Sequence, residues 1–294
     1  MKDFFKKSIL ALERRNLLNI LSDKLYIKLL YKVKTGHRLD LKNPKSFNEK
    51  MQWLKLYDRN PLYIKLVDKY EVKKYVHDLI GKEYIIKTLG VWDNFDEINF
   101  DNLPNQFVLK CTHDSGGVII CKDKSKINII DIKNKITKSL RTNYYHHGRE
   151  WPYKNVKPRI IAEEYIEDKT NKELNDYKFF CFDGIPKIMY VSKNSHTNKQ
   201  QIAFFDMNYN QLNIKRNDYL DFEQVPKKPK NFNKMKELAE ILSKNMPHVR
   251  VDFYNINGKI YFGEMTFFTG GGIIPFLDKK WDYEIGKLLE LPKK

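Results

Sequence analysis

The sequence predicts an α+β protein in which a helical N-terminal region precedes two strand-rich lobes. Three observations lead to this fold class. Residues 1–80 carry helical patterns with clear caps, the rest of the chain is rich in short apolar runs between glycine turns, and a charged stretch, EDKTNKELND, divides those runs into two groups. We therefore expect a helical part over residues 1–82, a small lobe over residues 83–167 and a large lobe over residues 168–294.

The N-terminal part is predicted to be helical over residues 1–35 and 45–80. In SFNEKMQWLKLYD, Ser46 and Glu49 have the spacing of a capping box, and apolar residues recur near one face. Pro61 begins a second helical run, PLYIKLVDKYEVKKYVHDLI, which ends at a glycine.

The first 18 residues, MKDFFKKSILALERRNLL, predict a basic amphipathic helix. Its apolar stretch is short and no small-residue cleavage site follows, which argues against a secretory signal. Such a helix could lie on an anionic membrane surface, although docking on the body of the protein is the commoner fate. No apolar run approaches the roughly 20 residues that span a bilayer. We expect a cytoplasmic protein, with peripheral contact at the inner face of the membrane as a further option.

The small lobe is predicted to contain strands around a glycine turn. EYIIKTLGVW predicts a strand or a strand and turn, while FVLKCTH and VIIC predict two strands joined by the turn DSGG. A helical stretch over residues 125–145 follows, and RIIAEEYI predicts the next strand.

The large lobe is predicted to contain two hairpins. DYKFFCFDGIPKIMYVS turns about Asp183 and Gly184, and QIAFFD adds a strand. A helix over residues 233–245 precedes the second hairpin, VRVDFYNINGKIYFGEMTF, and WDYEIGKLLEL is the last predicted helix.

The second hairpin places two carboxylates, Asp252 and Glu264, in apolar strands, where an uncompensated charge is costly. Its Asn-Gly pair favours a two-residue turn, which puts Asp252 opposite Gly263 and turns Glu264 to the other face. A three-residue loop shifts the register and puts both acids on one face with Arg250. A shared face therefore requires an odd-length or bulged loop at the Asn-Gly connection.

Two carboxylates side by side on one sheet face repel each other unless a cation lies between them. Because the ligands would be hard oxygens, that cation would be Mg²⁺ or Mn²⁺, which usually shares its coordination with phosphate oxygens. The alternative is that each acid merely pairs with one of the many lysines.

The 294-residue chain has a net charge of +17, which predicts an anionic partner such as a nucleotide, a nucleic acid, an anionic lipid or an acidic polysaccharide. Its richness in lysine and asparagine is equally explained by A·T-rich codons. The three cysteines show no C-x-x-C pair, so neither a disulfide framework nor a structural zinc site is suggested, and a reducing cytosol fits.

FVLKCTHDSGGVIIC combines a lysine at the end of an apolar strand with a glycine turn. Glycine N–H groups can cradle phosphate oxygens, and Lys110 would add a point charge. Neither G-x-x-x-x-G-K-[ST] nor G-x-G-x-x-G is present. Taken alone, the stretch is more simply an ordinary hairpin.

Two further motifs have nucleotide-binding interpretations. RIIAEEYI could pass along an adenine edge, with the backbone of Tyr165 and Ile166 reading the base and a carboxylate binding the ribose or the amino group. Taken alone, it is more simply an edge strand with solvated glutamates. Lys178 in DYKFFCF could reach a terminal phosphate, or it could be one more surface lysine.

Together and in this order, these motifs resemble the ATP-grasp superfamily, whose fold clamps ATP between two α+β lobes. The nearer resemblance is to the TupA-like (teichuronopeptide-biosynthesis) ATP-grasp family of bacterial surface-polysaccharide clusters. It rests on the phrases SFNEKMQWLKLYDRNP, FVLKCTHDSGG, KPRIIAEEYI, DYKFFCFDG and VRVDFYNINGKIYFGEMTF, and it runs over residues 38–290.

The resemblance implies a role for each matched residue. Lys110 would contact the α and β phosphates of ATP, Lys178 the terminal phosphates, and Lys69, placed loosely, would be a further ATP lysine. Asp252 and Glu264 would bind Mg²⁺. The loop over the phosphates would be formed by His113, Ser115, Gly116 and Gly117, and the adenine hinge by Glu163, Glu164, Tyr165 and Ile166. For His113, a role in loop structure or phosphate contact is favoured over that of a general base.

The resemblance also bears on two further residues of the last hairpin, Arg250 and Thr266. Arg250 matches the R-x-D of the peptide-ligase members, in which the arginine stabilises the acyl-transfer intermediate. Thr266 stands where most ATP-grasp ligases carry a metal-binding asparagine, and a hydroxyl is a weaker ligand, so a second metal ion would be held less strongly here. The following TFFTGGG would be a backbone-rich loop near the acceptor.

The resemblance implies an ATP-dependent carboxylate–amine ligase that works through an acyl phosphate and releases ADP. It would join an amino acid or amine to a uronic acid of a capsular or other surface polysaccharide. An alternative is a glycosyltransferase of the same pathway that uses a nucleotide sugar, although its usual D-x-D is absent. A non-enzyme alternative is a basic nucleic-acid or membrane-surface module, but the basic segments are scattered, so no nucleic acid is expected as a partner.

Overall fold

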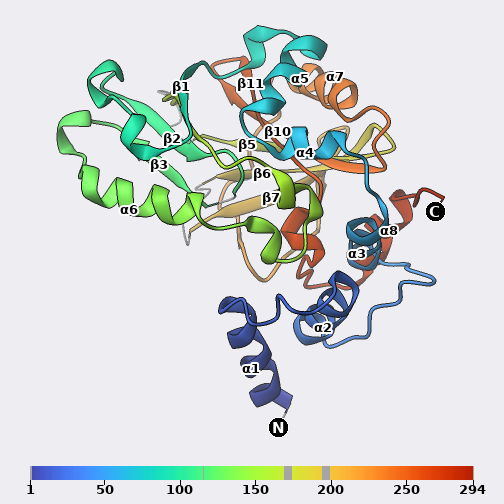
Figure 1. Ribbon diagram of the computed structural model, residues 1–294. Coiled ribbons are helices and arrows are strands. Elements are labelled where there is room, and N and C mark those ends of the chain that lie inside the picture. The colour runs from blue at the N-terminus through green and yellow to red at the C-terminus, as the bar shows by residue number, and fades with distance from the viewer. Residues whose placement is uncertain (1, 115, 169–173, 194–198, 294) are drawn as a thin grey trace.

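The computed structural model describes residues 2–114, 116–168, 174–193 and 199–293 of the chain. Its N-terminal part is helical, as predicted, and two β-sheets follow (Figure 1). The helices are α1 (Lys2–Arg14), α2 (Asp23–Thr35), α3 (Phe47–Tyr57), α4 (Leu62–Val67), α5 (Glu71–Ile80), α6 (Ile129–Leu140), α7 (Phe232–Ser243) and α8 (Lys280–Leu288).

Helix α3 starts at the predicted capping box. The Ser46 hydroxyl accepts a hydrogen bond from the Glu49 N–H at 3.2 Å, and the Glu49 carboxylate accepts one from the Ser46 N–H at 3.1 Å. The cap places Phe47 against the large sheet, where its ring lies 5.2 Å from that of His248 and 6.2 Å from that of Phe180. This helix therefore fixes the N-terminal region to one face of the large sheet.

The second predicted helical run is interrupted at Asp68. Its carboxylate accepts hydrogen bonds from the backbone N–H groups of Tyr70 at 2.8 Å and Glu71 at 3.2 Å, so the chain ends α4 there and begins α5. In the break, the Lys69 N–H donates to the Thr112 carbonyl at 3.0 Å. The break thereby fixes Lys69 beside the glycine turn of the small lobe.

The small sheet has the antiparallel strand order β1-β4-β2-β3. Its strands are β1 (Thr88–Trp92), β2 (Phe107–Cys111), β3 (Val118–Cys121) and β4 (Ile160–Glu164). Because side chains alternate along each strand, Phe107 and Ala162 join Ile136 of α6 in one apolar core. The other face presents Lys110 and Glu163, which form an ion pair.

The large sheet has the order β11-β10-β5-β6-β7-β8, and β9 pairs with β7 in parallel. Its strands are β5 (Asp176–Phe182), β6 (Ile185–Lys193), β7 (Gln201–Asp206), β8 (Gln211–Leu212), β9 (Leu220–Asp221), β10 (His248–Ile256) and β11 (Lys259–Thr266). The predicted turn at Asp183 and Gly184 is confirmed, with φ of 48° and 75°. Helix α7 covers one face, where Phe232 stacks on Phe179 with ring centroids 5.9 Å apart.

The opposite face of the large sheet is divided between packing and polar chemistry. One end is covered by Phe47 of α3. Further along the same strands, Lys178 pairs in register with Asp252 and with Tyr190. This polar part of the face is where the predicted site residues of the large lobe lie.

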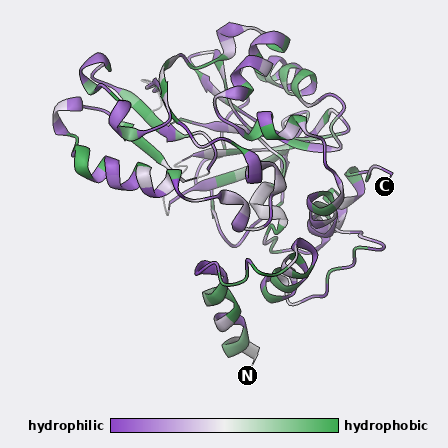
Figure 2. Ribbon diagram, in the orientation of Figure 1, coloured by the Kyte–Doolittle hydropathy of each residue, from purple (hydrophilic) through white to green (hydrophobic). Residues whose placement is uncertain are grey.

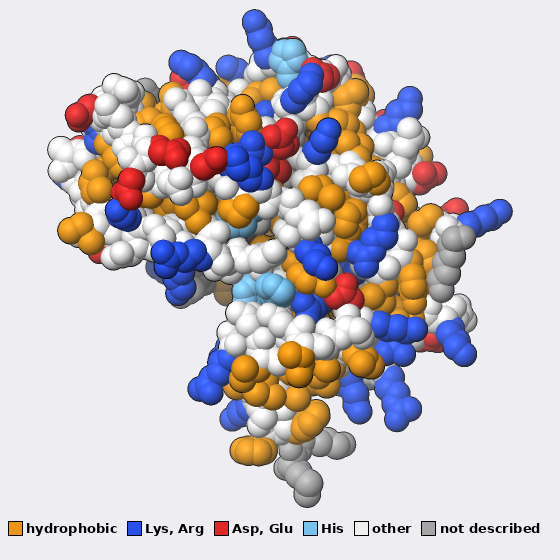
Figure 3. Space-filling model, in the orientation of Figure 1, with side chains coloured by type: hydrophobic (Ala, Val, Ile, Leu, Met, Phe, Trp, Pro, Cys, Tyr) orange, Lys and Arg blue, Asp and Glu red, His pale blue; other side chains and the backbone are white. Residues whose placement is uncertain are grey.

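Helix α1 projects away from both sheets beside α2 (Figure 1). Figure 2 shows both hydrophobic and hydrophilic residues along α1, whose sequence is KDFFKKSILALER. Phe4 is 77% exposed, Phe5 55% and Ile20 92%. In Figure 3 hydrophobic side chains gather at the lower end of the molecule, where α1 lies in Figure 1, with lysines and arginines on either side.

The three cysteines, Cys111, Cys121 and Cys181, are buried and unpaired. In the part of the chain that the structure describes, none of the helices has the length and apolar character needed to cross a membrane.

Candidate active site

The last hairpin changes register between its turn and its open end. Its Asn-Gly turn has φ of 51° and 80°, the geometry of a two-residue hairpin loop, and the register that this turn sets holds as far as the Phe253–Phe262 pair. Beyond that pair, Asp252 lies opposite Glu264. Gly263 is therefore an extra residue in β11, a β-bulge.

This bulge corrects the connection expected from the sequence. A shared face was expected to require an odd-length or bulged loop at the Asn-Gly turn, but the turn is a plain two-residue one and the extra residue is Gly263. A Cβ at Gly263 would lie 3.1 Å from the Asp252 carbonyl oxygen, a contact tighter than most side chains make. The glycine thus lets the strands approach closely where Asp252 and Glu264 meet on one face.

Asp252 is 2% exposed and is enclosed by two cations. Arg250 donates to its carboxylate from Nε at 2.7 Å and from Nη2 at 2.6 Å, and Lys178 donates from Nζ at 2.6 Å. A buried carboxylate requires such compensation, since removing an ion from water costs several kcal/mol. The alternative that an acid pairs with a lysine is therefore met for Asp252, through Lys178, and both cations around it are residues predicted to belong to the site.

Glu264 shares the same arginine and is half exposed. Its Oε1 accepts from Arg250 at 2.9 Å and from the Thr266 hydroxyl at 3.3 Å. Burial raises the pKa of Glu264, but the charges of Arg250, Lys178 and Lys69 outweigh it and lower the pKa to about 2. Glu264 is therefore an anion at neutral pH.

Lys178 lies at the centre of the polar row on the large sheet. Besides Asp252, its Nζ lies 3.5 Å from the Asp176 carboxylate. Burial lowers the pKa of Lys178, but Asp176 and Asp252 outweigh that effect and raise the pKa well above its usual value. The ammonium group is thus held charged, as a phosphate-binding lysine must be.

The small sheet contributes a second compensated cluster around Glu163. Lys110 reaches one carboxylate oxygen at 2.6 Å and Lys73 of α5 reaches the other at 2.5 Å. Burial raises the pKa of Glu163, but these two cations outweigh it and lower the pKa to about 2. Glu163 therefore holds Lys110 and Lys73 together on the face of the small sheet that α6 leaves uncovered.

Lys69 lies between the two clusters. Its Nζ donates to the Asp114 carbonyl. Burial lowers its pKa, the charges of Glu264 and Asp114 oppose that lowering, and Lys110 adds to it. One lysine therefore interacts with charges of both sheets, so both clusters lie in the neighbourhood of Lys69.

The glycine turn is fastened to α6 by polar contacts. The Gly117 N–H donates to the Asp114 carboxylate at 3.0 Å, and the Ser139 hydroxyl donates to the same carboxylate. His113 is 2% exposed, and its Nε2 lies 3.2 Å from the carbonyls of Ser139 and Thr142. The ring is thus directed toward the end of α6, which fits the expected structural role in the loop.

The remaining loop residues differ in what surrounds them. A Cβ at Gly116 would meet open space. Ser115 lies outside the described residues. Contact of Ser115 and Gly116 with phosphate stays a prediction.

The predicted hinge follows β4. Glu164 turns to solvent and forms an exposed ion pair with Lys87 at 3.2 Å, while its N–H donates to the Lys87 carbonyl at 3.0 Å. The Tyr165 hydroxyl donates to Glu167, and Ile166 is half-buried. Of the four predicted hinge residues, only Glu163 has its side chain among the charged residues of the site.

Three charged residues of this region were missed from the sequence. Lys73 lies on α5, four residues after Lys69, and that spacing within the helical run predicted from the sequence was the available signal. Lys55 and Glu150 are 1% and 5% exposed, although a charged residue is expected to be exposed. Nothing in their local sequence indicated burial.

The donor set at the hairpin fits a divalent cation. Asp252 and Glu264 are opposed carboxylates, and Thr266 adds a hydroxyl beside them, which are the hard oxygen ligands that Mg²⁺ prefers. Among the described residues there is no group of three or more His, Cys, Asp and Glu side chains that could hold a metal ion. A cation here would therefore complete its coordination with water or substrate oxygens.

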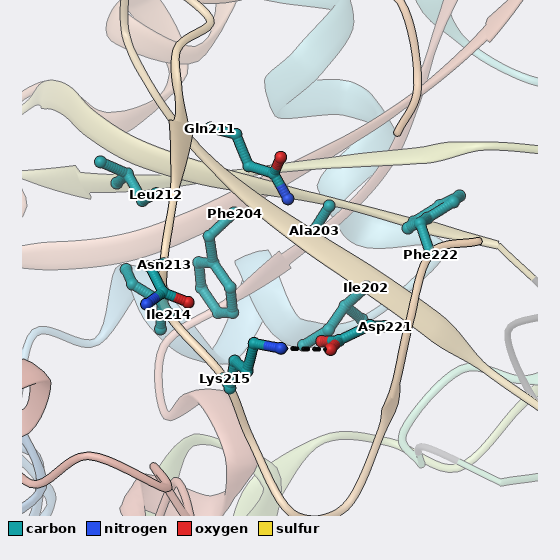
Figure 4. A pocket seen from close by; sticks show the side chains of 10 residues that line it. All are labelled: Ile202, Ala203, Phe204, Gln211, Leu212, Asn213, Ile214, Lys215, Asp221 and Phe222. Carbon is teal, nitrogen blue, oxygen red and sulfur yellow. Dashed lines mark hydrogen bonds and ion pairs between the residues drawn. The ribbon is translucent and has the colours of Figure 1, made fainter. Parts of the chain in front are cut away.

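A pocket of ≈ 170 Å³ lies elsewhere on the large sheet, around β7 and the segment that follows it (Figure 4). An ion pair between Lys215 and Asp221 at 2.6 Å closes one side. In the strand order, β7 is separated from β10 by β5 and β6, and the pocket contains none of the predicted site residues.

The chain is similar to several solved structures of ligases. The D-alanine–D-alanine ligase of Helicobacter pylori matches with a TM-score of 0.42 at 18% identity, over 84% of this chain and 70% of that one. The D-alanine–D-alanine ligase of Bacillus anthracis, complexed with ATP, matches with a TM-score of 0.39 at 17% identity, over 69% of this chain. The present chain spans 53% of the length of that enzyme. The ATP-grasp ligase PsnB matches with a TM-score of 0.40 at 8% identity, over 76% of this chain and 62% of that one.

No protein with a curated description matches the sequence. The family described as TupA-like ATPgrasp, however, matches residues 49–290, which include both sheets and every predicted site residue. The fold class and the resemblance expected from the sequence are thereby confirmed. The chain belongs to the TupA-like ATP-grasp family and has the α+β ATP-grasp fold.

Proposed function

We propose that this protein is an ATP-dependent carboxylate–amine ligase that forms an amide through an acyl phosphate and releases ADP. The observation that carries the proposal is the direct opposition of Asp252 and Glu264, brought about by a bulge, next to Arg250 and Lys178. Paired carboxylates with adjacent cations, in a member of an ATP-grasp family, are suited to phosphoryl transfer from a metal-bound nucleotide.

The small lobe, residues 83–167, and the large lobe, residues 168–294, would hold ATP between their sheets. Lys110 would contact the α and β phosphates and Lys178 the terminal phosphates. The loop over the phosphates and the adenine hinge would be the segments predicted from the sequence. The charge interactions of Lys69 with both clusters support this arrangement.

Asp252, Glu264 and Thr266 would hold Mg²⁺, or Mn²⁺ in its place, and the ion would neutralise the charge that develops on the transferred phosphoryl group. A carboxylate oxygen of the substrate attacks the γ-phosphorus, the bond to the β–γ bridging oxygen breaks, and ADP leaves. Lys178 and Arg250 are positioned beside the metal ligands to stabilise the negative charge of both transfers. An amine then displaces phosphate from the acyl phosphate.

The carboxylate substrate would be a uronic acid of a capsular or other bacterial surface polysaccharide, or its sugar precursor, and the amine would be an amino acid or a simple amine. The resemblance of the chain to a family from bacterial surface-polysaccharide clusters supports this class of substrate. The net charge of +17 supports an acidic partner.

The test is nucleotide turnover with defined substrates. The protein is incubated with ATP and Mg²⁺, with glucuronate or galacturonate, and with a panel of amino acids and amines. ADP and phosphate release that needs both the uronate and the amine is the expected result. Release of AMP and pyrophosphate, or nucleotide released only from a nucleotide sugar, would overturn the ligase assignment, and the second outcome would favour a glycosyltransferase.

Peripheral contact with an anionic membrane is proposed for α1 and the segment after it. Phe4, Phe5 and Ile20 are exposed apolar side chains flanked by basic residues, the composition that binds anionic lipid surfaces. Such contact would hold the enzyme at the inner face of the membrane.

Vesicle sedimentation tests the membrane contact. The protein is expected to sediment with phosphatidylglycerol-containing vesicles but not with phosphatidylcholine vesicles, and the double variant Phe4→Asp, Phe5→Asp is expected to lose this binding. Leu220→Asp is the control, because Leu220 is 52% exposed on the body of the protein and Phe5 is 55% exposed. Equal sedimentation of both variants would contradict the proposal.

A further inference from the structure

Glu150 is a buried acid that the proposed phosphoryl transfer does not use. It follows a strained turn in which Gly148 has a φ of 103° and Arg149, a non-glycine residue, a φ of 59°. Arg149 is 2% exposed and stacks its guanidinium on the ring of Tyr26 at 4.3 Å. The turn is therefore anchored on the α2 side, and that anchoring fixes where Glu150 points.

The carboxylate of Glu150 has no partner. The residue is 5% exposed, yet among the described residues no hydrogen bond or ion pair reaches its side-chain oxygens. Neither of these oxygens is fully sealed from solvent, so the carboxylate is the part of Glu150 that reaches the surface. A buried acid without a partner is costly, and its oxygens are available to a ligand.

The surroundings of Glu150 are built by α3 and the glycine-rich loop after β11. Lys55 donates from Nζ to the carbonyls of Gly148 at 2.8 Å and Gly271 at 2.6 Å, while Gln52 donates to the Gly272 carbonyl at 2.6 Å. An ideal Cβ at Gly271 would lie 3.9 Å from the Glu150 Oε1. The loop backbone thus passes directly beside the acid.

Glu150 also lies near the candidate active site. The charges of Lys55 on α3, Arg250 on β10 and Glu264 on β11 all act on its carboxyl group, and Glu150 in turn acts on the hydroxyl of Tyr153. An unpartnered acid whose carboxyl group is acted on by the charges of Arg250 and Glu264 is suited to bind the second substrate.

We propose that Glu150 is the binding carboxylate and general base for the amine substrate. This inference rests on the proposed ligase function. The ammonium group of the substrate binds to the Glu150 carboxylate and gives it one proton, which leaves a neutral amine. The amine nitrogen forms a bond to the carbonyl carbon of the acyl phosphate. The bond between that carbon and the oxygen that bridges it to phosphorus breaks, and phosphate leaves with the electron pair and takes the second amine proton.

The titration of Glu150 suits this role. Burial raises the pKa of Glu150 to about 7, although the charges of Lys55 and Arg250 oppose the rise. Burial also lowers the pKa of Lys55 to about 8. A base is most effective when its pKa is near the working pH, and general base catalysis contributes about 10²–10⁴-fold.

The test separates the two half-reactions in the wild type and in Glu150→Gln, which keeps the size of the side chain. With ATP, Mg²⁺ and a uronate, hydroxylamine traps the acyl phosphate as a hydroxamate, and because it is uncharged at neutral pH it needs no base. We expect equal hydroxamate formation in both proteins, and a loss of about 10²–10⁴-fold in kcat/KM for the amine in Glu150→Gln.

Two further variants sharpen the result. Glu150→Asp should recover part of the amine reaction, and the rise of kcat/KM for the amine through pH 7 that is expected for the wild type should be absent in Glu150→Gln. Glu284→Gln, at an exposed acid on α8, is the control and should match the wild type. An equal loss in both half-reactions, or no loss in either, would overturn the role of Glu150.

A binding measurement tests the ammonium site at Glu150 independently of turnover. If no uronate were turned over, only the ligase proposal would be overturned. At pH 8, methylammonium chloride should raise the melting temperature of the wild type above that in sodium chloride of equal ionic strength. Glu150→Gln should lack this shift. The same shift in both proteins would overturn the ammonium site.

Discussion

At the scale of single residues, the protein holds its buried charges by mutual compensation. Asp252, Arg250 and Lys178 are each less than one-tenth exposed, and the two cations share one carboxylate. Substitution of any one of these residues should lower the stability of the fold strongly, because the loss of one partner leaves another charge buried and unpaired. The ion-pairing and metal-binding interpretations of Asp252 are therefore compatible: of the two cations that balance it, Lys178 is expected to contact the terminal phosphates and Arg250 to stabilise the acyl-transfer intermediate.

His248 gives the fold a predicted sensitivity to acid. It is 2% exposed, its Nδ1–H donates to the Cys181 carbonyl at 2.9 Å, and its Nε2 is buried without a partner among the described residues. Burial, assisted by the charge of Arg250, lowers the pKa of His248 to about 3, whereas an unfolded histidine has a pKa of about 6.5. Below pH 6.5 only the unfolded state binds this proton, so stability falls as the pH falls toward 3.

We expect the free energy of unfolding to drop by about 1.4 kcal/mol per pH unit from this residue, or about 2 kcal/mol between pH 6.5 and pH 5. Urea unfolding at the two pH values measures the drop. His248→Phe should flatten this part of the pH dependence, while His37→Gln, at an exposed histidine, should not. An unchanged pH dependence in His248→Phe would contradict the assignment.

Lys73 and Lys74 make a matched pair on α5. The Lys73 side chain is 14% exposed and pairs with the buried Glu163, whereas that of Lys74 is 81% exposed and pairs with Asp78 on the surface. Lys73→Met should lower the free energy of unfolding by about 3 kcal/mol, because it removes one partner of a buried pair. Lys74→Met should change it by less than about 0.5 kcal/mol. Similar effects of the two substitutions in chemical denaturation would refute the buried cluster.

At the scale of elements, the hairpin of β10 and β11 is the feature that assembles the metal ligands. Its turn sets one register and Gly263 changes it by one residue, so that Asp252 and Glu264 face each other. A two-residue turn without the bulge would have left the acids on opposite faces.

Substitution of Gly263 tests the bulge. A Cβ would lie 3.1 Å from the Asp252 carbonyl oxygen, so Gly263→Ala should be mildly harmful and Gly263→Val more so, at about 1–3 kcal/mol of stability. Because the strands must separate at Asp252, the concentration of Mg²⁺ needed for half-maximal ATP binding should rise with side-chain size. Tyr261→Val, on the same strand, is the control. Unchanged Mg²⁺ dependence in Gly263→Val would show that the bulge does not position the ligands.

The elements themselves were predictable because local signals determine them. The capping box at Ser46 and the turn at Asp183 both appear where the sequence places them. The bulge at Gly263 was not predictable, because it depends on the contact of that residue with the neighbouring strand. The break at Asp68 was missed although its cause is local: the Asp68 side chain competes with helix continuation by accepting hydrogen bonds from the backbone N–H groups of Tyr70 and Glu71.

The residues of the site were predictable to different degrees. Lys110, Lys178, Asp252 and Glu264 stand in motifs whose order carries the information. Glu150 stands in no motif, and only its burial between helix α3 and the glycine-rich loop singles it out. Tertiary packing, which local sequence does not encode, therefore separates what could be predicted from what could not.

At the scale of the whole molecule, two sheets present their polar faces to one region while helices cover their outer faces. α6 packs on the small sheet and α7 on the large one, and Lys69 interacts with charges of both. α3 adds a third wall, since it fastens both the large sheet and the loop beside Glu150. The same helix therefore links the N-terminal region to the proposed acceptor side of the site.

The central claim, that Mg·ATP binds at Asp252 and Glu264, is tested most directly by thermal unfolding with ligands. Mg·ATP at a hundredfold excess over its Kd should stabilise the wild type by about 2.7 kcal/mol, and a nucleotide sugar should not. Asp252→Asn and Glu264→Gln, each compared with its own ligand-free state, should lose most of this stabilisation, and Glu284→Gln should keep it. Full stabilisation by Mg·ATP in both site variants, or a larger effect of the nucleotide sugar, would contradict the account.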